Sequence, residues 1–134
     1  MNKLIVDTNI LLRIFVNEGN EQNKETFRVL EKVDKGSLIL IVPNEVVIEA
    51  VWVMESYYKF DRKVISSSIQ RLMESDGVEY NTYMYEAIIN YRVSKCDIVD
   101  LYLASLSRMT HTGILTWDQD FKKLDCEYFT PDQI

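Results

Sequence analysis

The 134-residue sequence is poor in the residues on which several common active sites depend, with one histidine, two cysteines and four scattered glycines. Cys96 and Cys126 are isolated, and neither has a histidine or cysteine at metal-ligand spacing, which disfavours a zinc site. The glycines form no glycine-rich phosphate loop, and no serine lies in a nucleophile elbow. A mechanism that needs a histidine base has one candidate, His111, which lies in a polar loop sequence.

Long apolar runs are also missing. A membrane-spanning helix needs about 20 predominantly apolar residues, and every apolar run in this sequence is shorter. The N-terminus carries one lysine, a short apolar run and then an acid, a pattern that differs from a secretory signal peptide. Together with the isolated cysteines, this pattern predicts a protein of the reduced cytoplasm that has no membrane contact.

Positive charge is in deficit, because 15 lysines and arginines stand against 21 acids and give a net charge of -6. Taken alone, this balance argues against a protein that wraps nucleic acid by charge. Four acids gathered around two divalent cations would be neutralised locally, which would bring the effective charge from -6 to -2. Net charge is therefore weak evidence against a nuclease and no evidence for one.

The length fits one domain over residues 1–134. Short apolar runs predict strands over Lys3–Val6, Leu38–Val42, Val78–Tyr80, Gly113–Thr116 and Glu127–Phe129. Helical spacing predicts helices over Asn9–Phe15, Glu21–Lys35, Asn44–Tyr58, Asp61–Ser75, Asn81–Ser94 and Asp97–Met109. Asn20 and Asp61 suit the N-caps of the second and fourth of these helices. Strands that alternate with helices are typical of an α/β protein whose parallel sheet is covered on both faces. The first two strands are expected to be buried.

Four acids lie inside or beside apolar runs. Asp7 follows the first strand, at the edge where ligands bind in open α/β sheets. Glu49 lies in the middle of an almost wholly apolar helix, while Asp100 and Asp118 lie in the last helix and after the Thr116 strand. Few lysines or arginines accompany them, so a cluster of these acids would need cations. Carboxylate oxygens favour Mg²⁺ or Mn²⁺ over zinc.

Simpler interpretations of these acids stay open. Asp97 suits the N-cap of its helix, which places Asp100 in the first turn near the positive end of the helix dipole. Asp118 and Asp120 suit a turn that is followed by a short helix. Glu49 has no capping role to explain it.

The ordered set of these segments resembles the PIN domain, and most of all the VapC-type toxins of bacterial toxin–antitoxin pairs. The matching segments are Asp7-Thr8-Asn9 after a strand, Val46–Met54 around Glu49, Asp97-Ile98-Val99-Asp100, and Thr116-Trp117-Asp118-Gln119-Asp120-Phe121. The resemblance covers nearly the whole chain. It implies a three-layer α/β/α fold with a central, mainly parallel sheet of four or five strands.

The resemblance also implies a ribonuclease that depends on Mg²⁺ or Mn²⁺. Carried over by position, the catalytic and metal-binding acids are Asp7, Glu49, Asp100 and Asp118. The positions that support them are Thr8, Asn9, Asp97, Thr116 and Asp120. The family further implies an RNA substrate, a cognate antitoxin protein and a homodimer.

Three other functions are compatible with parts of this pattern. A PIN nuclease of RNA maturation or decay would carry the same acids without a toxin role. A non-catalytic PIN-like binding domain has no reason to keep four compensated acids. A phosphatase-like protein with an aspartate nucleophile would want a second acid two residues after Asp7, where Asn9 stands.

Overall fold

The computed structural model describes residues 2–134, which form two compact units, one through Asn81 and one over Thr82–Ile134. The first unit contains, in order, β1 (Asn2–Ile5), α1 (Thr8–Phe15), α2 (Glu21–Asp34), β2 (Leu38–Val42), α3 (Asn44–Ser56), α4 (Arg62–Met73) and β3 (Val78–Tyr80). The second contains α5 (Thr82–Tyr91), α6 (Ile98–Thr110), β4 (Ile114–Leu115), the 3₁₀ helix η1 (Gln119–Lys123), β5 (Tyr128–Phe129) and the 3₁₀ helix η2 (Pro131–Gln133).

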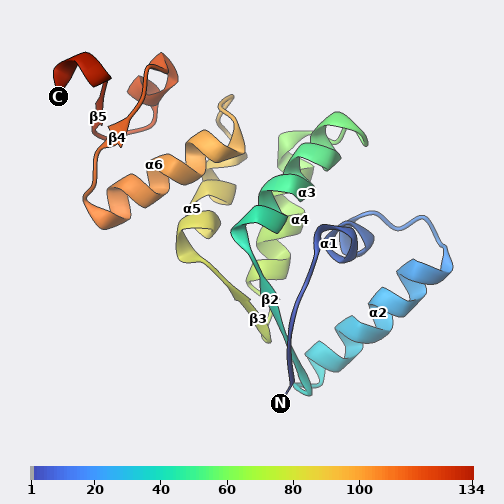
Figure 1. Ribbon diagram of the computed structural model, residues 1–134. Coiled ribbons are helices and arrows are strands. Elements are labelled where there is room, and N and C mark those ends of the chain that lie inside the picture. Colours follow the sequence, from blue (N-terminus) through green and yellow to red (C-terminus); the bar gives the residue numbers. More distant parts are fainter. Residues whose placement is uncertain (1) are drawn as a thin grey trace. The chain divides into compact units, whose positions relative to one another are not determined.

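The first unit is built on a three-stranded parallel sheet in the order β1-β2-β3 (Figure 1). Ile5 pairs with Ile41, and the Val6 backbone N–H donates to the Ile41 carbonyl at 3.0 Å. Because both strands end at the same edge, α1 and α3 also begin there. This edge carries Asp7, as predicted from the sequence.

The predicted first strand is present as β1, but the prediction that it is buried is wrong. All four residues of β1 are exposed, with Leu4 at 55 % and Ile5 at 71 %. The reason is its place in this sheet, where β1 pairs with β2 alone. The middle strand, β2, instead alternates buried and half-buried residues. Both strands contain consecutive apolar residues, Leu4–Ile5 in β1 and Leu38–Val42 in β2, and such a run does not by itself separate an edge strand from a central one.

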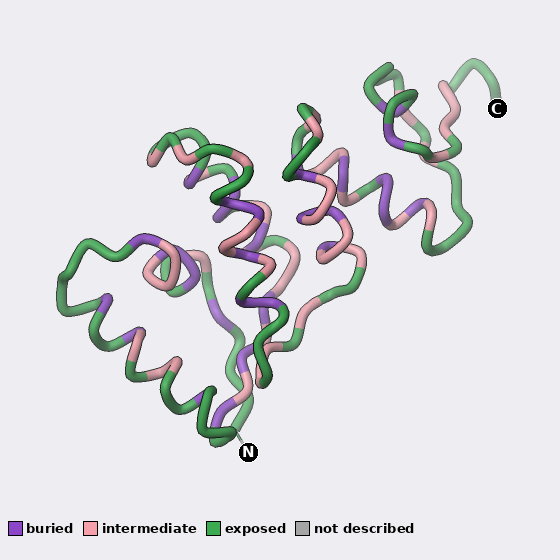
Figure 2. The backbone as a smooth tube through the Cα atoms, turned by 180° about the vertical axis from the view of Figure 1, so that it is seen from behind, coloured by how far each residue is buried: buried purple, intermediate pink, exposed green. Residues whose placement is uncertain are grey.

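The core of the first unit forms from buried positions on β2, α1, α3 and α4 (Figure 2). In α3 the buried residues are Val47, Ala50, Val51 and Met54. This spacing marks a single buried face, although the sequence is apolar almost all round. The helix therefore buries one face and leaves the other more exposed, which its apolar sequence did not predict.

A buried asparagine joins the end of α1 to the start of α2. The side-chain nitrogen of Asn23 donates to the carbonyls of Arg13 and Val16, at 3.0 and 2.9 Å. Its side-chain oxygen accepts from the backbone N–H groups of Glu18 and Asn20, at 3.1 and 3.4 Å. Asn20 in turn caps α2, as predicted from the sequence. The Asn23 side chain thus bonds the backbone at four points across the turn between the two helices.

Two glycines in the left-handed region allow a matched test of packing. Gly36 has φ +76° and Gly77 has φ +82°, so alanine is strained at both. A Cβ at Gly77 would lie 2.9 Å from the Val33 side chain and 3.3 Å from the Leu38 carbonyl, whereas a Cβ at Gly36 meets nothing within 4 Å.

We expect Gly36→Ala to lower the free energy of unfolding by about 1 kcal/mol, the cost of the backbone strain alone. Gly77→Ala should cost about 2–3 kcal/mol, because the buried Val33 must also shift. Urea denaturation of both variants measures the difference. Equal losses would contradict the packing at Gly77.

The second unit pairs two helices and a short sheet. Helices α5 and α6 pack side by side, and β4 pairs with β5 in parallel (Figure 1). The 3₁₀ helix η1 buries Phe121, and Leu124 directly after it is also buried. These two residues fix the segment that carries Asp118 and Asp120 to the rest of the unit.

The mixed α/β class predicted from the sequence is confirmed. Over residues 2–134, a pair of α-helices follows each of the first three strands, and every strand pairing is parallel, in a three-stranded and a two-stranded sheet. Within the same residues, no helix combines the length and the apolar character that crossing a membrane would require.

Candidate functional site

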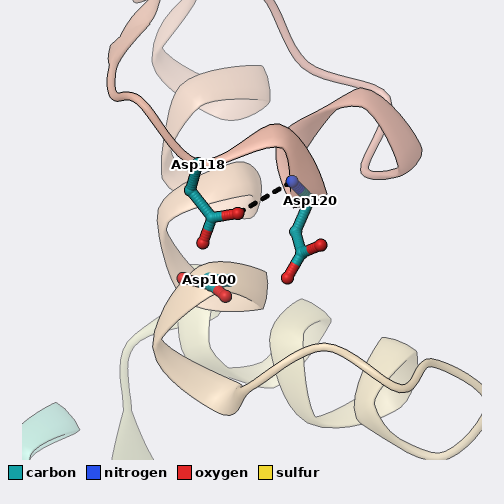
Figure 3. Close-up of side chains that lie close together, drawn as sticks. All are labelled: Asp100, Asp118 and Asp120. Carbon is teal, nitrogen blue, oxygen red and sulfur yellow. Dashed lines mark hydrogen bonds between the residues drawn. The ribbon is translucent and has the colours of Figure 1, made fainter.

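Three aspartates of the second unit converge. One carboxylate oxygen each of Asp100, Asp118 and Asp120 lies within 4.8 Å of the others, and we call these three residues the acidic cluster. Asp100 comes from the first turn of α6, Asp118 is the residue just before η1, and Asp120 lies in the first turn of η1. The side chains of Asp118 and Asp120 point toward the helix that carries Asp100 (Figure 3).

Asp100 is positioned by the start of α6. Asp97 is the N-cap residue, and its side chain accepts a hydrogen bond from the Val99 backbone N–H at 3.2 Å. The predicted capping role of Asp97 is therefore confirmed, and Asp100 is the third residue of the helix. The helix dipole favours a carboxylate at this place. Asp97 caps the helix and Asp100 belongs to the acidic cluster, so both interpretations of this segment are compatible with the structure.

Asp118 and Asp120 are positioned by hydrogen bonds within the acidic turn, which we define as Thr116–Asp120. The Asp118 backbone N–H donates to the Thr116 hydroxyl, and the Asp120 backbone N–H donates to the Asp118 carboxylate, both at 2.9 Å. The Thr116 backbone N–H donates to the Phe129 carbonyl at 2.8 Å and so ties the turn to β5. Asp118 is the N-cap of η1, which confirms the predicted turn and short helix.

The acidic cluster is electrostatically strained. Partial burial raises the pKa of Asp100 above its usual value, and the charges of Asp118, Asp97 and Asp120 raise it further. Carboxylates this close repel one another unless they are protonated or share a cation. Oxygen donors of this kind are the ligands that Mg²⁺ and Mn²⁺ prefer. The donor set therefore fits a divalent cation.

Three predicted residues of the first unit, Asp7, Thr8 and Asn9, follow the carboxyl end of β1. Asp7 is the N-cap of α1, and its carboxylate accepts from the Ile10 backbone N–H at 3.2 Å. Thr8 is half-buried, and Asn9 is exposed. Asp7 and Asn9 line a cleft between α1 and α2 with Arg13, whose Nε donates to Gln22 at 2.9 Å. The sequence had placed Asp7 after a strand but had not predicted its capping role.

Glu49 corrects the sequence prediction in one respect. We expected a carboxylate embedded among apolar residues, but Glu49 is exposed within its unit. Helical geometry explains this result, because Val47, Ala50 and Val51 turn to the core while Glu49 lies off their face. Its neighbour one turn earlier, Glu45, is also exposed. An exposed carboxylate is solvated by water, so Glu49 needs no cation or basic partner for α3 to fold.

A group that the sequence did not single out lies beside the end of η1. Arg108 of α6 forms an ion pair with Glu86 of α5, with 2.6 Å between Nη2 and Oε1. Arg108 also donates to the backbone carbonyls of Leu124 and Asp125, just after η1. An arginine in the last turn of a helix normally suggests compensation of the helix dipole, so the sequence carried no signal for these contacts.

Comparison with known proteins covers both units. A family model described as PIN domain matches residues 4–126. The chain is also similar to a protein named VapC ribonuclease from Aquifex aeolicus (strain VF5). The two are 28 % identical over 131 residues, which is 95 % of this chain and 96 % of that protein. The family match includes Asp7, Glu49 and the whole acidic cluster, and the chain belongs to the PIN domain family.

Proposed function

We propose that this chain is a divalent-metal-dependent endoribonuclease and the toxin of a type II toxin–antitoxin pair. The observation that carries the proposal is the acidic cluster, which lies in a chain of the PIN domain family. The similarity to a protein named VapC ribonuclease over 95 % of the chain supports RNA as the substrate class.

In this proposal Asp100, Asp118 and Asp120 hold a cation of the Mg²⁺ or Mn²⁺ type. A bound divalent cation would supply Lewis-acid stabilisation of the charge that develops on the scissile phosphodiester. The first turn of α6 and the acidic turn present the three carboxylates from two separate elements, so the donors are placed before any ligand arrives. Such preorganisation lowers the cost of binding.

The four acids carried over from the family, Asp7, Glu49, Asp100 and Asp118, are proposed to be the catalytic and metal-binding set. Asp7 has one carboxylate oxygen engaged in the cap of α1 and the other left for a ligand. Thr8, Asn9, Asp97 and Thr116 are proposed as supporting residues. Asp120, which the resemblance also gives as supporting, is proposed to assist Asp100 and Asp118 in holding the cation. With carboxylates as the working groups, no histidine base is required, which suits a sequence with one histidine.

A cognate antitoxin and a homodimer are part of the same proposal and rest on the family resemblance. Coexpression is the direct test of the toxin role. Expression of the chain alone should stop growth of a bacterial host, and coexpression of a small protein encoded next to its gene should restore growth. A nuclease of RNA maturation or decay would show RNA cleavage without this rescue.

Incubation of the purified protein with total RNA tests the chemistry. We expect cleavage with Mg²⁺ or Mn²⁺ and none with EDTA. Asp118→Asn and Asp7→Asn should each lower the rate by at least roughly 100-fold. Loss of a residue that only hydrogen-bonds to a metal ligand costs up to about 100-fold, and loss of the ligand itself should cost no less. Asp132→Asn is the matched control, since Asp132 is an exposed acid in η2.

Glu49 has its own control on the same helix. Glu49→Gln should abolish cleavage, whereas Glu45→Gln, one turn earlier and also exposed, should leave it within a few-fold of the wild type. Metal-independent cleavage, or full activity of Asp118→Asn, would overturn the proposed function. Full activity of Glu49→Gln alone would remove Glu49 from the set and leave the function standing.

A further inference from the structure

We infer that Arg108 is a positioning residue that sets the spacing of the acidic cluster, an inference that rests on the proposed function. Asp100 lies at the start of α6, and Arg108 lies about two turns further along the same helix. The other two acids belong to the acidic turn and η1. Whatever fixes η1 against α6 therefore fixes the distance between Asp100 and its two companions.

One side of the Arg108 guanidinium is held by Glu86. Nε and Nη2 donate to the same carboxylate oxygen, at 3.1 and 2.6 Å. The other oxygen of Glu86 accepts from the Ser105 hydroxyl at 2.8 Å. The ion pair is partly buried, with 24 % of the Arg108 side chain and 35 % of the Glu86 side chain exposed. The arginine is thus oriented by groups from both α5 and α6.

The other side of the guanidinium holds the chain just after η1. Nη1 donates to the Leu124 carbonyl, with a longer contact of 3.4 Å to the Asp125 carbonyl. The Leu124 backbone N–H donates to the Phe121 carbonyl at 3.2 Å and closes η1. Phe121 and Leu124 are 3 % and 8 % exposed. The apolar contacts give this end of η1 its place, and Arg108 adds the directional bonds.

The geometry carries this restraint to the carboxylates. Helix η1 has five residues, with Asp118 as its N-cap and Asp120 in its first turn. A segment this short moves as one piece, so a shift at Leu124 displaces both acids relative to Asp100. The contribution of Arg108 is positional, because its charge is already balanced by Glu86. The fork of five N–H donors suits this task, and a lysine cannot reproduce it.

The test compares binding of Mn²⁺ with stability. Arg108→Met keeps the apolar stem and removes every directional bond, and Arg28→Met is the control, because Arg28 is 65 % exposed with one 4.0 Å ion pair. Calorimetric titration should give a Kd for Mn²⁺ that is raised roughly 10- to 100-fold in Arg108→Met and unchanged in Arg28→Met. Arg108→Lys should fall between them.

The kinetic readout separates position from folding. Raising the Mn²⁺ concentration should restore most of the RNA cleavage by Arg108→Met, because the defect lies in binding of the metal. A folded Arg108→Met with the wild-type Kd for Mn²⁺ would overturn the inference. So would a loss of cleavage that saturating Mn²⁺ does not relieve while the Kd stays unchanged.

A second variant decides the question if Arg108→Met does not fold. Glu86→Gln keeps the volume and an oxygen for Ser105 but weakens the hold on Arg108. It should raise the Kd for Mn²⁺ by about threefold or more, and a wild-type Kd would overturn the inference. A wild-type protein that binds no Mn²⁺ and cleaves no RNA would instead overturn the proposed function, so the two failures are distinguishable.

Discussion

Replacing Asp100 with asparagine is expected to stabilise the metal-free protein while it lowers RNA cleavage by at least roughly 100-fold. In the acidic cluster, one oxygen of Asp100 lies within 4.8 Å of those of Asp118 and Asp120. Removing one of three like charges at this separation should raise the free energy of unfolding by about 1 kcal/mol after solvent screening. For a domain of this size that gain corresponds to roughly 3–6 °C in Tm.

The pH dependence of stability follows from the direction of the Asp100 shift. Its pKa in the folded protein is raised above the ordinary value of 3.8, so the folded state binds the proton more tightly than the unfolded state does. Protonation of Asp100 therefore favours the folded state. Its contribution to the free energy of unfolding is complete below pH 3.8 and is lost as the pH rises through the pKa of Asp100 in the folded protein. Metal-free wild type should therefore lose stability over this interval relative to Asp100→Asn, and the two Tm curves should converge at low pH.

Addition of Mn²⁺ should reverse the order of the two proteins. A cation that binds only the folded state stabilises it by about 2.7 kcal/mol at a concentration 100 times its Kd. Wild type should gain this amount, and Asp100→Asn should gain little. Thermal melts with EDTA and with Mn²⁺ measure both effects.

Asp61→Asn is the control for this experiment. Asp61 caps α4 through its side chain at 2.9 Å, and asparagine caps a helix as well as aspartate does. Its free energy of unfolding should stay within about 0.5 kcal/mol of the wild-type value, with or without Mn²⁺. An Asp100→Asn protein that is less stable than wild type in EDTA would show that the cluster does not repel as its geometry requires.

Element positions were predictable from the sequence because local signals decide them. The apolar run Leu38–Val42 and the short run Val78–Tyr80 form strands with the predicted bounds. Asn20, Asp61 and Asp97 form the predicted caps, since an N-cap needs only its own side chain and the next turn of backbone.

Burial was less predictable, because it depends on which face of an element meets the rest of the unit. Glu49 has apolar neighbours along the chain, but those neighbours lie on other faces of α3. Ile5 belongs to an apolar strand and is 71 % exposed, because β1 lies at the edge of its sheet. Sequence adjacency to apolar residues therefore located the candidate acids without showing how buried they are.

Contacts between distant residues left no local signal at all. Arg108 and Glu86 are 22 positions apart, and each resembles an ordinary surface charge in the sequence. Asp120 was assigned a supporting role from the resemblance, whereas the structure places it among the three carboxylates of the cluster. The distances between side chains follow from the docking of η1 on α6, which depends on packing by Phe121 and Leu124.

Asn23 was missed for the same reason and should have the largest effect on stability. In the sequence it is one of several polar residues in the first turn of α2, yet in the structure it is 1 % exposed. Its side chain makes four hydrogen bonds to backbone groups between the last turn of α1, at Arg13, and the N-cap of α2, at Asn20. Backbone groups at helix ends have no partner within the helix, so they depend on side chains such as this one.

Asn23→Ala is expected to lower the free energy of unfolding by about 3 kcal/mol, or roughly 10–15 °C in Tm. The loss combines a small cavity with buried carbonyls and N–H groups that lose their partner. Asn23→Asp should be as damaging despite its equal size, because it replaces the donor to the Arg13 and Val16 carbonyls with an acceptor.

Gln22→Ala is the matched control, because Gln22 is an exposed neighbour with one hydrogen bond, from Arg13 Nε at 2.9 Å. It should cost less than about 1 kcal/mol in urea denaturation. If Asn23→Asp were as stable as wild type, the side chain would not bridge the two carbonyls. If Asn23→Ala and Gln22→Ala lost equal stability, the turn would be held by its backbone alone. We expect both Asn23 variants to have a much lower free energy of unfolding than Gln22→Ala. The reason is that water does not replace the buried side-chain donor that bonds the two carbonyls.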